Sequence, residues 1–121
     1  MIPRILFVDD EPPIRELLSL YFRKKGYEVN TVATGQEAME MADSERFNAA
    51  IVDLNLAGEN GLELLGFLKS NFPEVPIIVF TGLPDPDLLG KAMAGGASAF
   101  MSKTDSLDKL FAEVSKHVPA V

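Results

Sequence analysis

Short apolar runs and longer amphipathic patterns alternate along this chain. Three uninterrupted apolar runs, Ile5–Val8, Ala49–Val52 and Ile77–Phe80, have the length of strands that are buried on both faces. Two further segments, Glu28–Val32 and Ala99–Met101, mix polar with apolar residues or are flanked by serines, which favours strands at the edges of a sheet. The pattern therefore predicts three central strands and two edge strands.

Between these runs, apolar residues recur at helical spacing, and each set predicts a helix with one apolar face. The sets are Ile14, Leu17, Leu18 and Tyr21; Ala38, Met41 and Ala42; Leu62, Leu65 and Leu68; Leu88, Leu89, Ala92 and Met93; and Leu107, Leu110, Phe111 and Val114. We expect the methionines to serve mostly as core residues.

Residues at the ends of the predicted helices support these boundaries. Pro12 and Pro13 suit a first helical turn, where proline is tolerated, and Gly26 can end that helix. Thr34 and Glu37 have the spacing of a capping box at the start of the second helix.

A strand and a helix thus alternate five times, which predicts a doubly wound α/β domain with a five-stranded parallel sheet. Three central and two edge strands, with the second strand at an edge, match the flavodoxin-like order 2-1-3-4-5. In that order the first and third strands are neighbours at the point where the winding reverses, and a ligand is expected beyond their carboxyl ends.

Composition narrows the class of protein. The 121 residues fit one domain, and 47% hydrophobic residues are enough for a core. There is no cysteine, which excludes disulfides, thiol nucleophiles and cysteine metal sites. No apolar run reaches membrane-spanning length, so we expect no membrane association and a cytoplasmic location. A formal net charge of −7 argues against direct binding of nucleic acid by this domain.

Polar side chains follow four of the five predicted strands. Asp9, Asp10 and Glu11 follow the first strand, and Asp53 follows the third. Thr81 follows the fourth strand, and Lys103 follows the fifth. Because the carboxyl ends of parallel strands share one edge of the sheet, these groups are expected to converge on the predicted crevice.

The residue types in this crevice indicate phosphoryl transfer. Three converging carboxylates repel one another, so one must be protonated or a cation must bind, and Mg²⁺ is the natural partner of such oxygen ligands. In phosphoryl transfer a carboxylate such as Asp53 can attack phosphorus, while a metal ion, an ammonium group such as Lys103 and a hydroxyl such as Thr81 stabilise charge on the phosphoryl oxygens. We interpret Glu11 as a solvated acid in the first helical turn and not as a ligand.

Across essentially its whole length, the chain resembles the receiver domains of bacterial two-component response regulators. The motif residues of that family are matched by the acidic pair Asp9 and Asp10, the phosphoacceptor Asp53, the hydroxyl switch residue Thr81, the aromatic switch residue Phe100 and the lysine Lys103. Gly61 matches the family's glycine eight residues after the acceptor, and Gly82 matches the small residue that follows the hydroxyl switch residue. The resemblance also assigns the backbone carbonyl of Asn55 to Mg²⁺.

The resemblance implies a signalling switch and not an enzyme. A sensor histidine kinase or histidine phosphotransfer protein would donate the phosphoryl group to Asp53 with Mg²⁺. Thr81 would then move toward the phosphoryl group and Phe100 inward, which reshapes the surface of the fourth helix, fifth strand and fifth helix. A downstream effector or attached output domain would read that surface, with the receiver a monomer or a phosphorylation-dependent dimer. Residues 1–121 would form a receiver domain, either standing alone or at the start of a longer regulator.

The chain departs from the family pattern at two positions. Thr104 stands where a proline usually follows the lysine through a cis bond, and Ala57 stands where proline is common after the acceptor. A cis bond before a residue other than proline costs about 2.5–4 kcal/mol. The Lys103–Thr104 bond is therefore either trans, with an adjusted loop, or cis and strained.

Three other functions share parts of this pattern. A Mg²⁺-dependent aspartyl phosphatase of the haloacid-dehalogenase type also uses an aspartate, a hydroxyl and a lysine, but it places the nucleophile after its first strand. A flavodoxin-like electron carrier is disfavoured, because the acids after the first strand would repel a flavin phosphate. A degenerate receiver that acts as an interaction module independently of phosphorylation would lack some of the groups that are present here.

Overall fold

The computed structural model describes residues 2–44, 46–56, 60–82 and 85–120. Within these ranges the chain forms one parallel sheet in the order β2-β1-β3-β4-β5. The strands are β1 (Arg4–Val8), β2 (Glu28–Val32), β3 (Ala49–Val52), β4 (Ile77–Thr81) and β5 (Ala99–Ser102). The helices are α1 (Pro12–Lys24), α2 (Gly35–Ser44), α3 (Gly61–Asn71), α4 (Pro86–Ala94) and α5 (Leu107–His117). The predicted doubly wound α/β fold and its strand order are confirmed.

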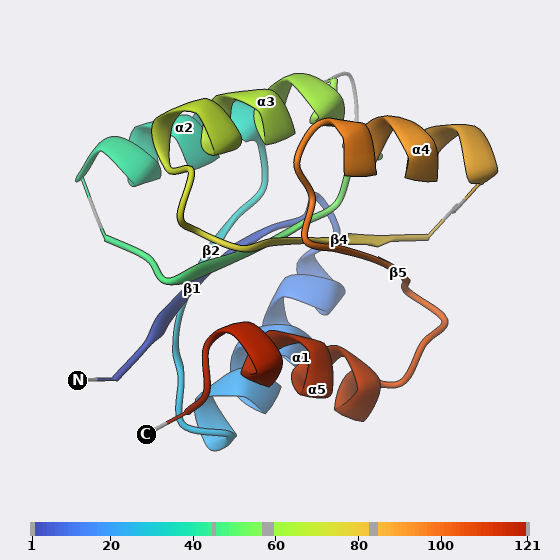
Figure 1. Ribbon diagram of the computed structural model, residues 1–121. Coiled ribbons are helices and arrows are strands. Elements are labelled where there is room, and N and C mark those ends of the chain that lie inside the picture. The colour runs from blue at the N-terminus through green and yellow to red at the C-terminus, as the bar shows by residue number, and fades with distance from the viewer. Residues whose placement is uncertain (1, 45, 57–59, 83–84, 121) are drawn as a thin grey trace.

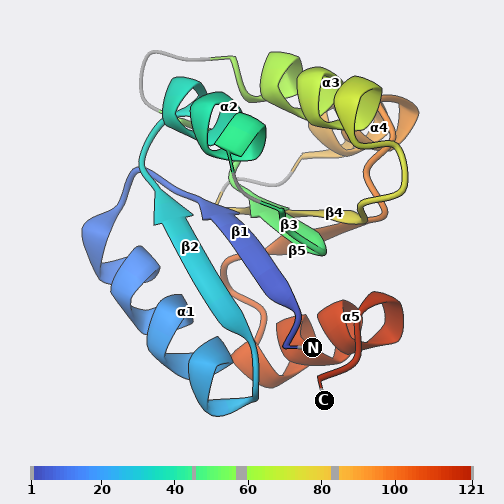
Figure 2. The same cartoon turned by 90° about the vertical axis from the view of Figure 1, so that its left-hand side faces the viewer.

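Helices cover both faces of the sheet. Figure 1 shows α2, α3 and α4 on one face and α1 and α5 on the other, and Figure 2 shows the same three layers from the side. The strand order changes direction between β1 and β3, and these two strands pair with Val8 opposite Val52. None of the described helices is both long enough and apolar enough to cross a lipid bilayer.

The three central strands are apolar throughout because each face contributes to a separate core. In β1, Leu6 and Val8 belong to the cluster beneath α2, α3 and α4, whereas Ile5 and Phe7 belong to the cluster beneath α1 and α5. The strands β3 and β4 alternate between the two clusters in the same way. An uninterrupted apolar run is therefore the pattern that a strand needs when both of its faces are buried.

The helix boundaries follow the residues that predicted them. The helix α1 begins at Pro12, and Gly26, at a φ of 99°, turns the chain after the helix has ended. A left-handed φ of this kind costs glycine little, since it has no Cβ. At the start of α2, the hydroxyl of Thr34 accepts a hydrogen bond from the amide of Glu37 at 3.1 Å.

The prediction was wrong about which apolar residues of α1 and α4 face the sheet. Leu17 is 49% exposed, Leu89 45% and Met93 44%, although each was assigned to an apolar face. Leu18 and Phe22 are the buried residues of α1, and Ala92 is the buried residue of α4. At about 100° per residue, Leu17 and Met93 lie roughly a quarter turn away from these buried positions, so the contact with the sheet does not reach them.

Gly61, at the start of α3, allows two backbone segments to approach closely. A Cβ atom at this position would lie 2.4 Å from both the Cα atom and the carbonyl oxygen of Leu54. Both clashing atoms belong to the backbone of the segment that follows Asp53, so neither can rotate out of the way. The close approach therefore fixes the position of α3 against the segment that carries Asp53 and Asn55.

We expect Gly61→Ala to lower the free energy of unfolding by roughly 1–3 kcal/mol, because the methyl group overpacks this contact. Gly66→Ala in the middle of the same helix is the matched control, since a Cβ there would meet no atom within 4 Å. That control should raise the free energy of unfolding by roughly 0.5–1 kcal/mol. Urea unfolding followed by circular dichroism measures both changes, and equal effects of the two substitutions would contradict the steric explanation.

Candidate functional site

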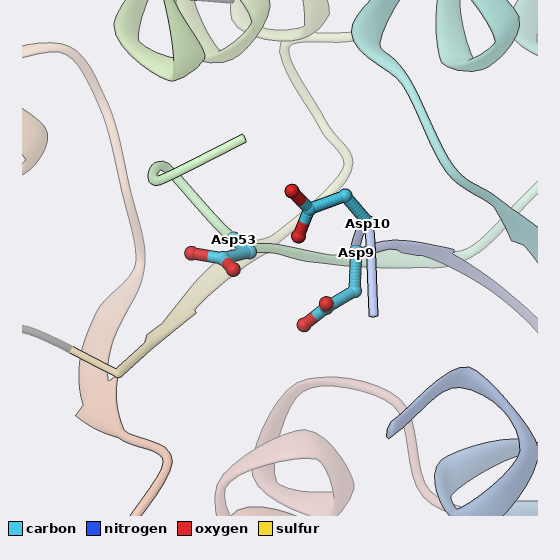
Figure 3. A group of neighbouring side chains, drawn as sticks. All are labelled: Asp9, Asp10 and Asp53. Atoms are coloured by element: carbon cyan, nitrogen blue, oxygen red, sulfur yellow. The ribbon is translucent and has the colours of Figure 1, made fainter. Parts of the chain in front are cut away.

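Three aspartates gather at the carboxyl edge of the sheet, beyond β1 and β3. Asp9 and Asp10 directly follow β1, and Asp53 directly follows its neighbour β3. One carboxylate oxygen from each lies within 4.8 Å of the other two. Figure 3 shows the three side chains as neighbours, with Asp9 and Asp10 on one side and Asp53 on the other. The structure thus brings together the three acids that the strand order placed at this edge.

Backbone amides fix one oxygen of each of the two buried aspartates. The Oδ1 atom of Asp9 accepts a hydrogen bond from the amide of Glu11 at 2.9 Å. The Oδ1 atom of Asp53 accepts one from the amide of Asn55, also at 2.9 Å. Each carboxylate therefore bonds to the amide two residues ahead, in the manner of an Asx turn, and keeps its Oδ2 atom for other partners.

The ammonium group of Lys103 lies between these two Oδ2 atoms. Its Nζ is 2.7 Å from Oδ2 of Asp9 and 2.8 Å from Oδ2 of Asp53. Asp9 is fully buried and Asp53 nearly so, whereas the side chain of Lys103 keeps a small exposed area. Lys103 is therefore the counterion of two buried carboxylates that arrive on different strands.

The loop after β5 places Lys103 through a trans Lys103–Thr104 peptide bond. The amide of Lys103 donates to the carbonyl of Thr81 at 2.8 Å, which continues the pairing of β5 with β4. The Oγ atom of Ser102 accepts from the amide of Thr104 at 3.1 Å, and a carboxylate oxygen of Asp105 accepts from the amide of Ser102 at 3.0 Å. Side-chain hydrogen bonds thus shape this turn without a proline. Ala57, the other departure from the family pattern, lies outside the described residues.

The pKa values of Asp9 and Lys103 are both raised, for different physical reasons. Burial raises the pKa of Asp9, and the charge of Asp53 adds to that effect, while hydrogen bonds from Lys103 and the amide of Glu11 oppose it. Burial alone would lower the pKa of Lys103, but its contacts with Asp53 and Asp9 outweigh burial and raise that pKa well above its usual value. Lys103 is therefore firmly cationic, and burial makes Asp9 harder to ionise.

Thr81 and Phe100, the two predicted switch residues, lie on neighbouring strands near this site. Thr81 is completely buried, and its hydroxyl oxygen has no hydrogen-bond partner among the described residues. A buried hydroxyl without a partner is costly, which favours a ligand oxygen as its missing partner. Phe100 is partly buried, and it lines a groove between α4 and β5 together with Pro86 and Leu89.

Two contacts near the site, made by Glu11 and Arg15, were not predicted from the sequence. Glu11 is largely exposed as predicted, but its Oε1 atom lies 3.3 Å from Nζ of Lys103. Arg15 donates from Nη1 to the backbone carbonyl of Asp9 at 2.7 Å, which holds the end of β1 against α1. The proline pair that follows Glu11 could have predicted the Glu11 contact. Prolines have no N–H, so a carboxylate before them has few helix amides to accept from and is available to another partner.

The donor set of this site fits Mg²⁺. Hard divalent cations prefer carboxylate and carbonyl oxygens, and Asp9, Asp10 and Asp53 supply three such groups within reach of a single ion. Lys103 neutralises only part of their charge. The three carboxylates therefore offer a divalent cation both oxygen ligands and opposite charge.

Comparison with known proteins places the chain next to response regulators. The family model of the response regulator receiver domain matches residues 5–115. The sporulation initiation phosphotransferase F of Bacillus subtilis is 29% identical over 116 residues, which are 96% of this chain and 94% of that protein. The transcriptional regulatory protein TcrA of Mycobacterium tuberculosis is 33% identical over 92% of this chain, but that match covers only 44% of TcrA.

Solved structures agree with the sequence matches. The response regulator TrrA of Thermotoga maritima, in complex with Mg²⁺ and BeF, superposes with a TM-score of 0.88 at 32% identity. That superposition covers 97% of this chain and 100% of TrrA.

The raised pKa of Asp9 predicts how Asp9→Asn changes stability in metal-free buffer. The folded protein binds the Asp9 proton more tightly than the unfolded chain, so ionised Asp9 opposes folding above its folded pKa. The substitution should therefore raise the free energy of unfolding at neutral pH, and the gain should shrink as pH falls through that raised pKa. Urea unfolding at several pH values with a chelator measures it. Asp43→Asn, at an exposed position of α2, is the control, and an equal gain there would refute this explanation.

The unpartnered hydroxyl of Thr81 predicts that Thr81→Val is stabilising. Valine keeps the shape of the side chain and removes a buried polar atom, so the free energy of unfolding should rise by about 1 kcal/mol. Thr34→Val is the matched control, because the Thr34 hydroxyl caps α2 and its removal should cost about 1 kcal/mol. Thermal unfolding of both variants tests the contrast, and a loss of stability in Thr81→Val would show that the hydroxyl has a partner.

Proposed function

The chain belongs to the response regulator receiver domain family, and from that membership we propose that Asp53 accepts a phosphoryl group in the presence of Mg²⁺. One observation carries the proposal. At the carboxyl edge of the sheet, Asp53 holds one oxygen on a backbone amide and the other on Lys103, with two further acids beside it. Attacking carboxylate, positive charge and metal ligands thus occupy one small region, as phosphoryl transfer requires.

In the proposed reaction, an oxygen of Asp53 attacks the phosphorus of a phosphohistidine. The new phosphorus–oxygen bond forms as the phosphorus–nitrogen bond breaks, and the electron pair of the broken bond leaves with the imidazole. Lys103 neutralises negative charge on the phosphoryl oxygens, and the Thr81 hydroxyl donates a hydrogen bond to one of them. Asp9, Asp10, Asp53 and the backbone carbonyl of Asn55 would hold Mg²⁺, which would supply further positive charge at the site.

The proposed switch begins at Thr81, which is buried and has no partner among the described residues. A phosphoryl oxygen on Asp53 would attract this hydroxyl and leave space behind it. Phe100, in the register position of β5 opposite Val79 of β4, would move inward to fill that space. Because Phe100 also lines the groove with Pro86 and Leu89, its movement would change the surface that α4 and β5 present to a partner.

Receiver domains exchange phosphoryl groups with histidine kinases or phosphotransfer proteins and act on output domains. For this chain we propose a cytoplasmic location, a sensor histidine kinase or histidine phosphotransfer protein as the donor, and a downstream effector or attached output domain as the target. The match to almost the whole of a sporulation phosphotransferase and to less than half of a transcriptional regulator is compatible with either arrangement. The domain would catalyse its own phosphorylation and dephosphorylation only, and we expect no direct contact with nucleic acid.

Three alternative functions are weaker on specific grounds. A haloacid-dehalogenase type phosphatase would place its nucleophile after the first strand, whereas Asp53 follows β3. A degenerate receiver would lack part of the site, whereas the aspartates, Lys103 and Thr81 are all present at one edge of the sheet. The cluster of three aspartates beside the β1–β3 edge also opposes the flavin phosphate of an electron carrier.

The proposal predicts that Asp53→Asn abolishes labelling by acetyl phosphate in the presence of Mg²⁺. Asparagine keeps the size of the side chain but removes the nucleophilic carboxylate, so the domain should stay folded and gain no phosphoryl mass. Intact-protein mass spectrometry measures the label, and circular dichroism checks the fold. Asp43→Asn, which alters an exposed acid of α2, is the matched control and should label like the wild type.

Each alternative has its own outcome in this experiment. A wild-type protein that takes no label with Mg²⁺ and acetyl phosphate is a degenerate receiver. Continuous turnover of small phosphate esters identifies a phosphatase. Labelling of Asp53→Asn at the wild-type rate excludes Asp53 as the acceptor.

A further inference from the structure

The ammonium group of Lys103 already contacts one oxygen of each buried aspartate of the proposed metal site. It contacts Oδ2 of Asp9 at 2.7 Å and Oδ2 of Asp53 at 2.8 Å. The Oδ1 atoms of both residues are already engaged with backbone amides. Lys103 must therefore give up at least one of its two close contacts before both Oδ2 atoms can turn to another cation.

Glu11 gives Lys103 a third contact that lies outside the metal-binding group. Its Oε1 atom is 3.3 Å from Nζ, and its side chain is 58% exposed, whereas Asp9 and Asp53 are buried. The group of acids that could hold a metal contains Asp9, Asp10 and Asp53 but not Glu11. Glu11 thus offers the ammonium group a position on the solvent side of the site.

The start of α1 explains why the carboxylate of Glu11 is available. Glu11 is the N-cap residue, a position where a side chain usually accepts hydrogen bonds from the first amides of the helix. Here the first two helical residues are Pro12 and Pro13, which have no N–H. The amide of Ile14 donates to the backbone carbonyl of Glu11 at 3.1 Å, and the side chain makes no capping bond.

We propose that Glu11 is a positioning residue for Lys103. Glu11 would hold the ammonium group on the solvent side of the site when a divalent cation replaces that group as the partner of Asp9 and Asp53. This inference rests on the proposed metal site. It adds that Lys103 and the metal ion compete for the same carboxylates, and that Glu11 favours the metal ion by binding the displaced ammonium group. Without Glu11, displaced Lys103 would have solvent as its only alternative to the two aspartates among the contacts described here.

The expected effect is modest because the Glu11–Lys103 pair is partly exposed. Exposed ion pairs contribute about 0.2–1 kcal/mol, which corresponds to a change in binding constant of up to about 5-fold. Glu11→Gln should therefore weaken Mg²⁺ binding about 2- to 5-fold. Glu16→Gln is the matched control, because it removes the same charge from an exposed position further along α1.

The decisive experiment is a double-mutant cycle on Mg²⁺ affinity, measured by isothermal titration calorimetry on the unphosphorylated protein. The cycle compares wild type, Glu11→Gln, Lys103→Gln and the double variant, with Glu16→Gln as the control for net charge. We expect Glu11→Gln to bind Mg²⁺ more weakly than Glu16→Gln. In the Lys103→Gln background, removal of Glu11 should have no further effect beyond that of Glu16→Gln. Circular dichroism checks each fold, and Lys103→Met replaces Lys103→Gln if that variant unfolds.

Three results would overturn the inference, and they are distinguishable. Equal affinities of Glu11→Gln and Glu16→Gln would show that only net charge matters. An effect of Glu11→Gln that persists without Lys103 would show that Glu11 acts on the metal directly. If the wild type binds no Mg²⁺, the proposed metal site fails and the role of Glu11 fails with it.

Discussion

Repulsion between buried carboxylates is the constraint around which this domain is organised. Asp9 and Asp53 stand on adjacent central strands, and their burial is tolerable because one ammonium group lies within 2.8 Å of both. Lys103 reaches them from the far edge strand, across the end of β4. The ion pairs therefore connect the end of β5 to the ends of β1 and β3, two strands with which β5 does not pair, and Asp10 lies at the same edge.

The position of the site between two cores gives it access to both layers of the molecule. Alternate residues of the central strands pack beneath α2, α3 and α4 on one face and beneath α1 and α5 on the other. Thr81 ends β4, with Phe100 on the neighbouring strand, while Glu11 and Arg15 connect the site to α1. The site thus borders residues that belong to opposite layers.

Much of this arrangement could be predicted from the sequence. Buried parallel strands appear as uninterrupted apolar runs, and the carboxyl ends of such strands lie at one edge of the sheet. The convergence of Asp9, Asp10, Asp53 and Lys103 followed from strand order alone. The exposure of Leu17, Leu89 and Met93 did not, because helical spacing identifies a face but not how far the neighbouring sheet extends. The contact of Glu11 with Lys103 was also missed, since it depends on side-chain placement between residues 92 positions apart.

The hydrogen bonds from the Glu11 and Asn55 amides to Asp9 and Asp53 have a consequence for the entropy of the site. Each amide restricts rotation of its carboxylate, so that side-chain freedom is lost when the domain folds and not when a ligand arrives. A carboxylate that is already oriented presents its remaining oxygen along a fixed direction, which lowers the ordering cost of the encounter with phosphorus or a metal ion. The two turns thereby move part of this ordering cost from ligand binding to folding.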